Sequence, residues 1–284
     1  MMLKCFIIFA VLAGSWNLKW FPSGRAEHRA SKRVEAANIA DAAEVIRDHL
    51  KGSGRIMFLQ EMRDAQSCSN LVKAVGDADL KVAAASAFRD FRDNRLQWQQ
   101  LGILTDLPVL ESGWGYARKA DGMFVPRGYA YALLDGGKDG RIACFCVHLK
   151  SNYGARKAAR KIENMKKREA GMRQVLEAAR KVRADRILIA GDFNSDRFQK
   201  SFRDEKIFSL LESDGFKDGW DGASLSERGT HPGNTRYPDS TLDYVFYKGF
   251  ARSPSRLLAP EVPVSDHRML VMSFETDAKS GETH

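Results

Sequence analysis

The sequence predicts an α+β fold in which two mixed sheets pack face to face with helices outside them. Runs of β-branched and aromatic residues, which indicate strands, occur along almost the whole chain. Helical patterns separate some of these runs, while two neighbouring runs are joined as a hairpin. This order differs from the regular strand–helix alternation of a parallel sheet and therefore favours a mixed arrangement.

The expected elements follow from the spacing of apolar residues. A core strand is expected over residues 11–21, and a helix is expected over 31–50 because its pattern ends at Gly52 and Gly54. The turn-forming run 135–140 lies between two strand patterns and predicts the hairpin. Further strands are predicted over 56–60, 100–104, 130–134, 142–149, 187–190, 242–247 and 269–274, and further helices over 155–183 and 208–212.

The chain has 284 residues, enough for one large domain or two small ones. Residues suited to catalysis are spread along it, so we expect a single domain over 11–276 and a tail over 277–284. The apolar run at the N-terminus is too short to span a bilayer, which needs about 20 residues. We expect residues 1–10 to form an export segment or an unstructured leader, which favours export or the cell envelope over the cytoplasm.

Composition excludes two other classes of protein. A hydrophobic fraction of 44% with 8 Pro is that of a globular chain and not of a disordered one. The four Cys show neither the spacing of a disulfide framework nor that of a zinc site. We therefore expect free and mostly buried thiols.

Positive charge is concentrated in one segment. The formal net charge is +9, and residues 155–183 contain eleven Lys or Arg against three Glu. Such a run fits a solvated helix face, and it fits an electrostatic footprint for nucleic acid or anionic membrane equally well. The segment begins shortly after a strand pattern that ends at His148, so its first turn, with Arg156, is expected close to any site there.

The strand pattern at 187–190 is followed by Gly191-Asp192-Phe193-Asn194. Alternation along an extended chain sends Asp192 and Asn194 to the same side, where both would face one ligand. These residue types are also common in turns, so the run alone fits a turn as well as a site. Other motifs with similar chemistry follow or flank strand patterns at Trp16-Asn17, Gln60-Glu61, His148-Leu149-Lys150, Leu242-Asp243-Tyr244 and Ser265-Asp266-His267.

Taken in order, these motifs resemble the endonuclease/exonuclease/phosphatase family of metal-dependent phosphoesterases. The resemblance runs from Trp16 to about Phe274. The succession Gly-Asp-Phe-Asn, Leu-Asp-Tyr and Ser-Asp-His is specific to the family but not to one substrate. The resemblance implies a four-layered α/β/β/α sandwich, with the active site where the strand ends of both sheets converge. It also implies hydrolysis of a phosphoester by in-line attack of an activated water.

The resemblance further implies a divalent cation, Mg²⁺ with Mn²⁺ as an alternative. Hard cations take oxygen ligands, usually one or two carboxylates with water and phosphate. Glu61 and Asp266 are the expected carboxylate ligands, and Asn17 matches the family residue that supports the metal ligands by hydrogen bonding. From the residues alone, Glu61 would also fit a solvated position at a strand end.

Five residues match the catalytic positions of the family. Asp192 would align or deprotonate the attacking water, and Asn194 would donate a hydrogen bond to the phosphoryl oxygens. His267 is expected to act as general base or electrostatic clamp, oriented by Asp243. His148 matches a histidine near the scissile phosphate, which it would meet as a cation or proton donor. A lone histidine at a strand end also fits a purely structural role.

The substrate is predicted less sharply than the chemistry. Lys150, Asn152 and Arg156 are expected phosphate contacts, and Tyr237 lies in a Gly- and Pro-punctuated loop of the kind that often carries specificity. The basic segment favours a nucleic-acid phosphodiester as substrate. We expect an endonuclease that acts on DNA more than on RNA, although the segment itself distinguishes neither. The alternatives are a lipid or small-molecule phosphoesterase, which would meet anionic membrane or phospholipid, and a non-catalytic polyanion-binding module. No obligate protein partner is implied.

Overall fold

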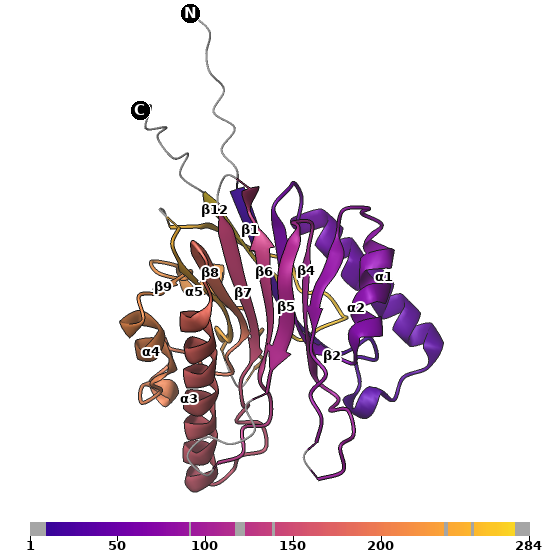
Figure 1. Ribbon diagram of the computed structural model, residues 1–284. Helices are drawn as coiled ribbons and strands as arrows, with labels where there is room; N and C mark the ends of the chain where they lie inside the picture. The colour runs from indigo at the N-terminus through magenta and orange to yellow at the C-terminus, as the bar shows by residue number, and fades with distance from the viewer. Residues whose placement is uncertain are drawn as a thin grey trace, which may run out of the picture.

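A computed structural model of the chain describes residues 10–90, 92–116, 123–137, 140–235, 238–250 and 253–275. Two six-stranded sheets lie face to face, and helices cover their outer surfaces (Figure 1). This four-layered α/β/β/α sandwich confirms the predicted fold class. Of the expected leader only residue 10 belongs to the described residues, and the expected tail over 277–284 lies outside them.

The first sheet takes strands from both ends of the chain, in the order β11-β12-β1-β2-β4-β3. Its strands are β1 (Ala10–Phe21), β2 (Arg55–Met62), β3 (Lys81–Ala85), β4 (Gln100–Thr105), β11 (Ser255–Leu258) and β12 (Leu270–Glu275). β1 runs parallel to β2 and antiparallel to β12, with Ala10 opposite Glu275. Both ends of the described chain therefore lie at one edge of the sandwich, and the C-terminal ends of β1 and β2 lie at the other.

The second sheet is built from the middle of the chain, in the order β5-β6-β7-β8-β10-β9. Its strands are β5 (Val109–Gly115), β6 (Tyr129–Asp135), β7 (Arg141–His148), β8 (Arg186–Asp192), β9 (Lys217–Asp218) and β10 (Asp243–Lys248). β6 and β7 form the predicted hairpin, and β7 runs parallel to β8 with His148 opposite Asp192. β10 is antiparallel to β8, so its first residue, Asp243, lies beside the last residue of β8.

Two pairs of helices form the outer layers. α1 (Lys32–His49) and α2 (Ala65–Val75) cover the first sheet, and α3 (Ala158–Lys181) and α4 (Ile207–Ser213) cover the second (Figure 1). The side chain of Ser31 accepts from the Val34 amide at 3.4 Å, and Asp64 caps α2 by accepting from the Ser67 amide at 2.8 Å. A short helix α5 (Leu225–Arg228) follows β9. Within the described ranges, no helix is both long and apolar enough to cross a membrane.

Buried apolar side chains form two main clusters, one on each side of the first sheet. One cluster joins the two sheets and contains Phe58 of β2 and Leu188 of β8. The other joins the first sheet to its helices and contains Met57 of β2, Ile46 of α1 and Leu71 of α2. Neighbouring residues of β2 thus enter different clusters, which is why its sequence is continuously apolar. Each fully buried side chain of this size stabilises the fold by about 1.5–3 kcal/mol.

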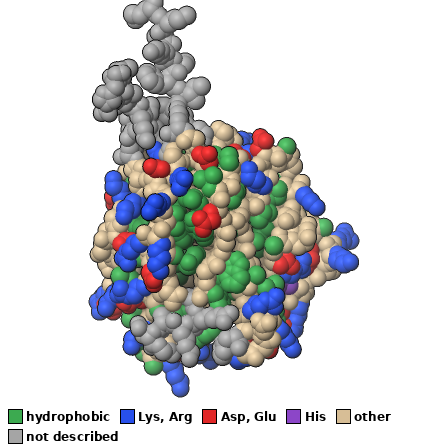
Figure 2. All heavy atoms as spheres, viewed as in Figure 1, with side chains coloured by type: hydrophobic (Ala, Val, Ile, Leu, Met, Phe, Trp, Pro, Cys, Tyr) green, Lys and Arg blue, Asp and Glu red, His purple; other side chains and the backbone are tan. Residues whose placement is uncertain are grey.

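Several elements were not predicted, namely α2, α5, β3, β5, β9 and β11. β5 is the outermost strand of its sheet, and its pattern is obscured because Leu110 and Trp114 stay exposed. Hydrophobic side chains are accordingly visible over the middle of the face in Figure 2. The predicted free thiols are present at Cys68, Cys144 and Cys146, all of which are buried.

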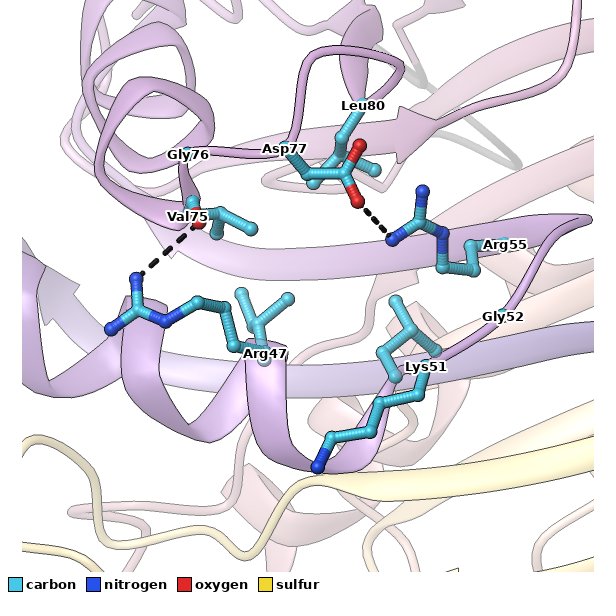
Figure 3. A pocket seen from close by; sticks show the side chains of 10 residues that line it. Arg47, Lys51, Gly52, Arg55, Val75, Gly76, Asp77 and Leu80 are labelled. Atoms are coloured by element: carbon cyan, nitrogen blue, oxygen red, sulfur yellow. Dashed lines mark hydrogen bonds and ion pairs between the residues drawn. The ribbon is translucent and has the colours of Figure 1, made fainter.

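A cavity of about 360 Å³ lies between the C-terminal ends of α1 and α2 and the start of β2 (Figure 3). Arg55 donates to Asp77 at 2.6 Å and to Asp106 at 2.9 Å. Arg47 donates to the Ala74 carbonyl at 2.7 Å, near the C-terminal end of α2. Arg47 of α1 therefore holds the two helices together, and Arg55 of β2 holds the segment after α2 against the sheet. This cavity lies at the opposite end of β2 from Glu61.

Candidate active site

The polar residues singled out in the sequence converge at one edge of the sandwich. β1, β2, β7 and β8 end there, while β10 and β12 begin there. Asn17 lies opposite Gln60 across the first sheet, and Asp192 lies between His148 and Asp243 in the second. This topology brings together residues as far apart in the sequence as Trp16 and His267, which are 251 positions apart: Trp16 Nε1 donates to the His267 carbonyl at 2.8 Å.

Asp192 lies at the centre of this group and is only 2% exposed. Its Oδ2 accepts from Asn17 Nδ2 at 2.9 Å and from Asn194 Nδ2 at 3.0 Å, while its Oδ1 accepts from the Asn194 amide at 2.8 Å. Burial raises the pKa of Asp192 to about 7, although the nearby positive charge of His267 opposes the rise. The carboxyl group is therefore held in one orientation and can exchange a proton near neutral pH.

Gly191 allows β8 to approach β7 closely beside Asp192. Its φ of +142° is in a region that other residues rarely adopt, and a Cβ there would lie 2.0 Å from the Val147 carbonyl oxygen. The Gly-Asp-Phe-Asn motif thus needs its glycine for packing. The same motif ends at Asn194, which also has a positive φ of 50°.

Glu61 stands across Asn17 from Asp192. Its Oε1 accepts from Asn17 Nδ2 at 3.2 Å, and its Oε2 accepts from the Trp20 amide at 3.0 Å. Glu61 itself adopts a positive φ of 61°, as do two neighbouring residues of β1, Lys19 at 45° and Trp20 at 53°. Pairing is irregular there in both β1 and β2. Such backbone strain is maintained only where the surrounding structure enforces it, and it is concentrated at functional sites.

His267 and Asp243 form the closest ion pair of the site. His267 Nδ1 lies 2.7 Å from Asp243 Oδ2, and Asp243 is fully buried. Burial would lower the pKa of His267, but the Asp243, Asp192 and Asp266 carboxylates outweigh it and raise the pKa to about 10. His267 is therefore a cation at neutral pH. The sequence left its role open between base and clamp, and this charge favours the clamp.

His148 is buried between Glu61 and Asp192. Its Nε2 lies 3.4 Å from Asp192 Oδ2 and 3.8 Å from Glu61 Oε1. Burial, together with the positive charges of Arg127 and His267, lowers the pKa of His148 well below its usual value. The ring is therefore neutral at pH 7. The lowered pKa disfavours both modes expected for it, contact as a cation and donation of its proton, and leaves a hydrogen bond from the neutral ring.

The surroundings of Glu61 are suited to a carboxylate that binds a metal ion. No Lys or Arg in the described part of the chain lies within 4.0 Å of its carboxylate, and its described neighbours within hydrogen-bond distance are amide groups. Those ranges contain no group of three or more His, Cys, Asp or Glu arranged to hold a metal. Mg²⁺ sites commonly take one or two carboxylates and complete their coordination with water and substrate oxygens, a requirement that Glu61 can meet.

The other two expected metal residues are partly committed to the protein. Asp266 Oδ2 is 3.0 Å from Lys19 Nζ, so its carboxylate already has a counter-ion. Asn17 directs its amide nitrogen to Glu61 and Asp192, and its oxygen accepts from the Lys19 amide at 3.0 Å. Asn17 is thus placed to support the carboxylates. Sequence reasoning missed Lys19. Its backbone has a positive φ where the regular pairing of β1 is interrupted, so strand alternation gave no signal for it.

The expected phosphate contacts lie on the loop between β7 and α3. The loop leaves the site directly, because the Leu149 amide donates to the Asp192 carbonyl at 2.8 Å. Lys150 is half-buried, and burial among the positive charges of Arg127 and the α3 side chains lowers its pKa to about 8. Asn152 is partly buried, whereas Arg156 is exposed. Tyr237 lies outside the described residues.

Two further arginines hold this loop, and neither was predicted. Arg127 donates to the His148 carbonyl at 2.9 Å and to the Leu149 carbonyl at 3.0 Å. Arg168, on the inner face of α3, donates to the Lys150 carbonyl at 2.6 Å and forms a buried ion pair with Glu205. Nothing in the local pattern around Arg127 marks it. Arg168 lies in the basic segment 155–183, where sequence analysis considered its charge but not its burial.

Comparison with known proteins agrees with this geometry. The model of the endonuclease/exonuclease/phosphatase family matches residues 14–267, a span that begins just before Asn17 and ends at His267. The chain therefore belongs to this family, whose members are hydrolases that act on phosphoester bonds and generally use divalent metals. No curated protein matches the chain significantly.

Solved structures share the fold at low sequence identity. An endonuclease/exonuclease/phosphatase from Beutenbergia cavernae is 18% identical with a TM-score of 0.64, and the match covers 94% of this chain and 72% of that one. One from Bacteroides vulgatus is 14% identical with a TM-score of 0.66, covering 95% and 100%. Truncated Caenorhabditis elegans TDP2 is 14% identical with a TM-score of 0.62, covering 94% and 98%. Such likeness shows the fold alone.

Proposed function

We propose that this protein is a metal-dependent phosphoesterase that cleaves nucleic-acid phosphodiesters by in-line attack of an activated water. The observation that carries the proposal is the buried Asp192 carboxylate, held by Asn17 and Asn194 beside Glu61 and the His267–Asp243 pair. Phosphoester hydrolysis needs a positioned water, neutralisation of phosphoryl charge and stabilisation of the transition state. The site offers a group suited to each requirement.

The roles follow from charge and orientation. Asp192 would orient the attacking water and accept its proton, because its pKa of about 7 is suited to proton transfer at neutral pH. The cationic ring of His267, fixed by Asp243, would stabilise negative charge on the phosphoryl oxygens. Neutral His148 would add a hydrogen bond. The Asn194 carboxamide, expected to donate to the phosphoryl oxygens, already donates to Asp192 Oδ2 at 3.0 Å and to the Leu149 carbonyl at 3.2 Å, so its part is to hold Asp192. A Mg²⁺ ion held by Glu61, when bound, supplies Lewis-acid polarisation of the phosphoryl group.

Cations on α3 and the preceding loop support a polyanionic substrate, although fewer are available than the sequence indicates. Arg156, Lys157 and Lys161 have no carboxylate partner among the described residues, whereas six others in the segment are paired: Arg160, Lys167, Arg168, Arg173, Arg180 and Lys181. Figure 2 shows Lys and Arg with interspersed Asp and Glu along the margin that α3 forms. Arg156 and Lys161 also line a cavity of about 450 Å³ with Asn152. Uncompensated charge therefore lies near the loop that leaves the active site.

A lipid or small-molecule phosphoester is the second candidate substrate. The observation that favours it is Tyr153, whose side chain is 96% exposed on the loop that also carries Arg156. An exposed aromatic ring beside cations is suited to the interface of an anionic membrane. The same residues would also serve nucleic acid, so the choice between the two requires a direct comparison of substrates.

A substrate panel tests the proposal. Supercoiled plasmid, single-stranded DNA and RNA oligonucleotides, sphingomyelin vesicles and inositol phosphates would each be assayed with Mg²⁺, Mn²⁺ or EDTA. We expect cleavage of nucleic acid with Mg²⁺ and its loss in EDTA. Release of phosphocholine or phosphate without nucleic-acid cleavage would instead favour the second candidate. Binding of polyanions without turnover of any substrate would identify a non-catalytic module.

We also predict that Arg156→Ala combined with Lys161→Ala weakens binding of single-stranded DNA and flattens its salt dependence. Loss of two phosphate contacts should lower the slope of log K against log salt by about 1.4. The matched control is Arg173→Ala combined with Arg180→Ala, which removes the same charge from residues already paired with Glu169 and Asp214. An equal change of slope in both variants would show that only net charge matters.

A further inference from the structure

A second cavity, of about 380 Å³, lies between β1 and the segment that precedes β4. Trp20, Trp98 and Arg127 line it, and its volume is within the range of about 300–1,000 Å³ typical of small-ligand sites. Two of these residues also contact the active site. The Trp20 amide donates to Glu61 Oε2 at 3.0 Å, and Arg127 donates to the His148 carbonyl at 2.9 Å. The cavity therefore adjoins the place where the scissile phosphate would be bound.

The two tryptophans belong to neither apolar cluster of the protein. Trp98 is 48% exposed, and the ring centroids of Trp20 and Trp98 lie 6.0 Å apart with planes tilted by 59°. Exposure of one large side chain is not unusual, but here two tryptophans lie together on the wall of a cavity. The pair therefore offers an aromatic surface to a ligand bound there.

His28 fixes the two tryptophans relative to each other. One ring nitrogen lies 3.1 Å from the Trp20 carbonyl oxygen, and the other lies 2.7 Å from that of Trp98. The fully buried side chain of Gln100 also braces the backbone that leads to Trp98, because it donates to the carbonyls of Phe88 and Gln97. The aromatic surface is thus preorganised, which lowers the entropic cost of binding.

The charge around the cavity identifies the kind of ligand. Arg92 and Arg95 are paired with Asp90 and Asp93, but no described carboxylate lies within 4.0 Å of Arg127. Three arginines against two aspartates leave the lining with a net positive charge, which disfavours a cationic headgroup such as choline. It suits a planar aromatic group attached to a phosphate, and a nucleobase has both features.

We propose that this cavity binds the base of the nucleotide next to the scissile phosphate, stacked on Trp98 with Trp20 beside it. The proposal rests on the proposed nuclease function and deepens it. A base in a duplex is stacked and paired with its neighbours, so it must leave the helix to enter the cavity. The enzyme therefore prefers single-stranded or unpaired nucleic acid, and binding depends on a base at one position relative to the cleaved bond.

The test measures binding of labelled oligonucleotides with Mg²⁺ in the Asp192→Asn background, where cleavage is expected to be slow. Trp98→Ala should weaken binding of single-stranded DNA by roughly 5- to 150-fold, as expected for one lost stacked base, with little effect on duplex. Trp98→Phe should retain most of the affinity. Trp114→Ala is the matched control, because Trp114 is 43% exposed and does not line the cavity.

A scan of single abasic sites along the oligonucleotide completes the test. One abasic position should reproduce the loss in the Trp98-containing protein and cause no further loss in Trp98→Ala. Equal weakening of single strand and duplex, or no position-dependent effect, would overturn the proposal while the nuclease function stands. Weaker binding only to phospholipid vesicles would assign the cavity to lipid. Absence of nucleic-acid binding and of cleavage by the unaltered enzyme would instead remove the nuclease function itself.

Discussion

Asp192→Asn is expected to lower kcat on nucleic acid by roughly 10²- to 10⁴-fold, the contribution of a well-placed general base. The substitution keeps the shape of the side chain but removes its negative charge. It also places an amide group where Asp192 now accepts three hydrogen bonds from Asn17 and Asn194. At least one N–H would then face another donor, so the water-binding oxygen would lose both its charge and its fixed orientation.

The matched control is Asp218→Asn on β9. Asp218 is also a buried aspartate, and it pairs with Arg197 at 2.9 Å and accepts from the Trp220 amide at 2.8 Å. It lies opposite Phe246, three residues along β10 from Asp243. Its substitution should therefore reduce stability while leaving kcat of the folded fraction close to that of the unaltered enzyme. A turnover number for Asp192→Asn within tenfold of normal would contradict the assigned role.

Much of this site could be predicted because its residues lie at strand ends. Glu61, His148 and Asp192 each lie at or near the end of an apolar run, whose hydrophobic pattern indicates where the strand stops, and Asn17 lies inside β1 at its last regular pair with β2. Because these strands meet at one edge of the sandwich, the residues lie close together in the structure. No additional local sequence motif is needed to predict that. The order of the motifs along the chain assigned Asp243 and His267 to the same site. These two residues are 24 positions apart and form one ion pair.

The residues that could not be predicted are those defined only by tertiary contact. Arg127 holds the carbonyls after β7, and Trp98 projects from a braced loop. Neither has a periodic neighbour that marks it. The charge state of His148 was also beyond the sequence, because it depends on burial among Arg127 and His267. The burial of polar residues on helix α3 could not be predicted either. Its inner face begins with the buried polar side chains of Asn164 and Arg168.

That inner face leads to the largest expected effect on stability. Glu205→Gln removes the carboxylate that pairs with Arg168, and the two side chains are only 3% and 1% exposed. An unpaired guanidinium would then remain buried, so the free energy of unfolding should fall by about 3–5 kcal/mol. Chemical denaturation measures the change. Glu177→Gln is the control, because it breaks the exposed pair with Lys181 and should cost less than about 1 kcal/mol.

The double variant Arg168→Met with Glu205→Leu separates the two functions of this pair. Apolar replacements of similar volume remove both charges and should restore most of the stability, as replacement of a buried pair often does. They cannot restore the hydrogen bond from Arg168 to the Lys150 carbonyl. The loop with Lys150 and Asn152 should therefore be less ordered than in the unaltered enzyme, so KM should be raised in a protein whose stability is restored. If the double variant has both normal stability and a normal KM, Arg168 serves folding alone. If its stability is restored while its KM stays above normal, Arg168 is a positioning residue for the substrate loop.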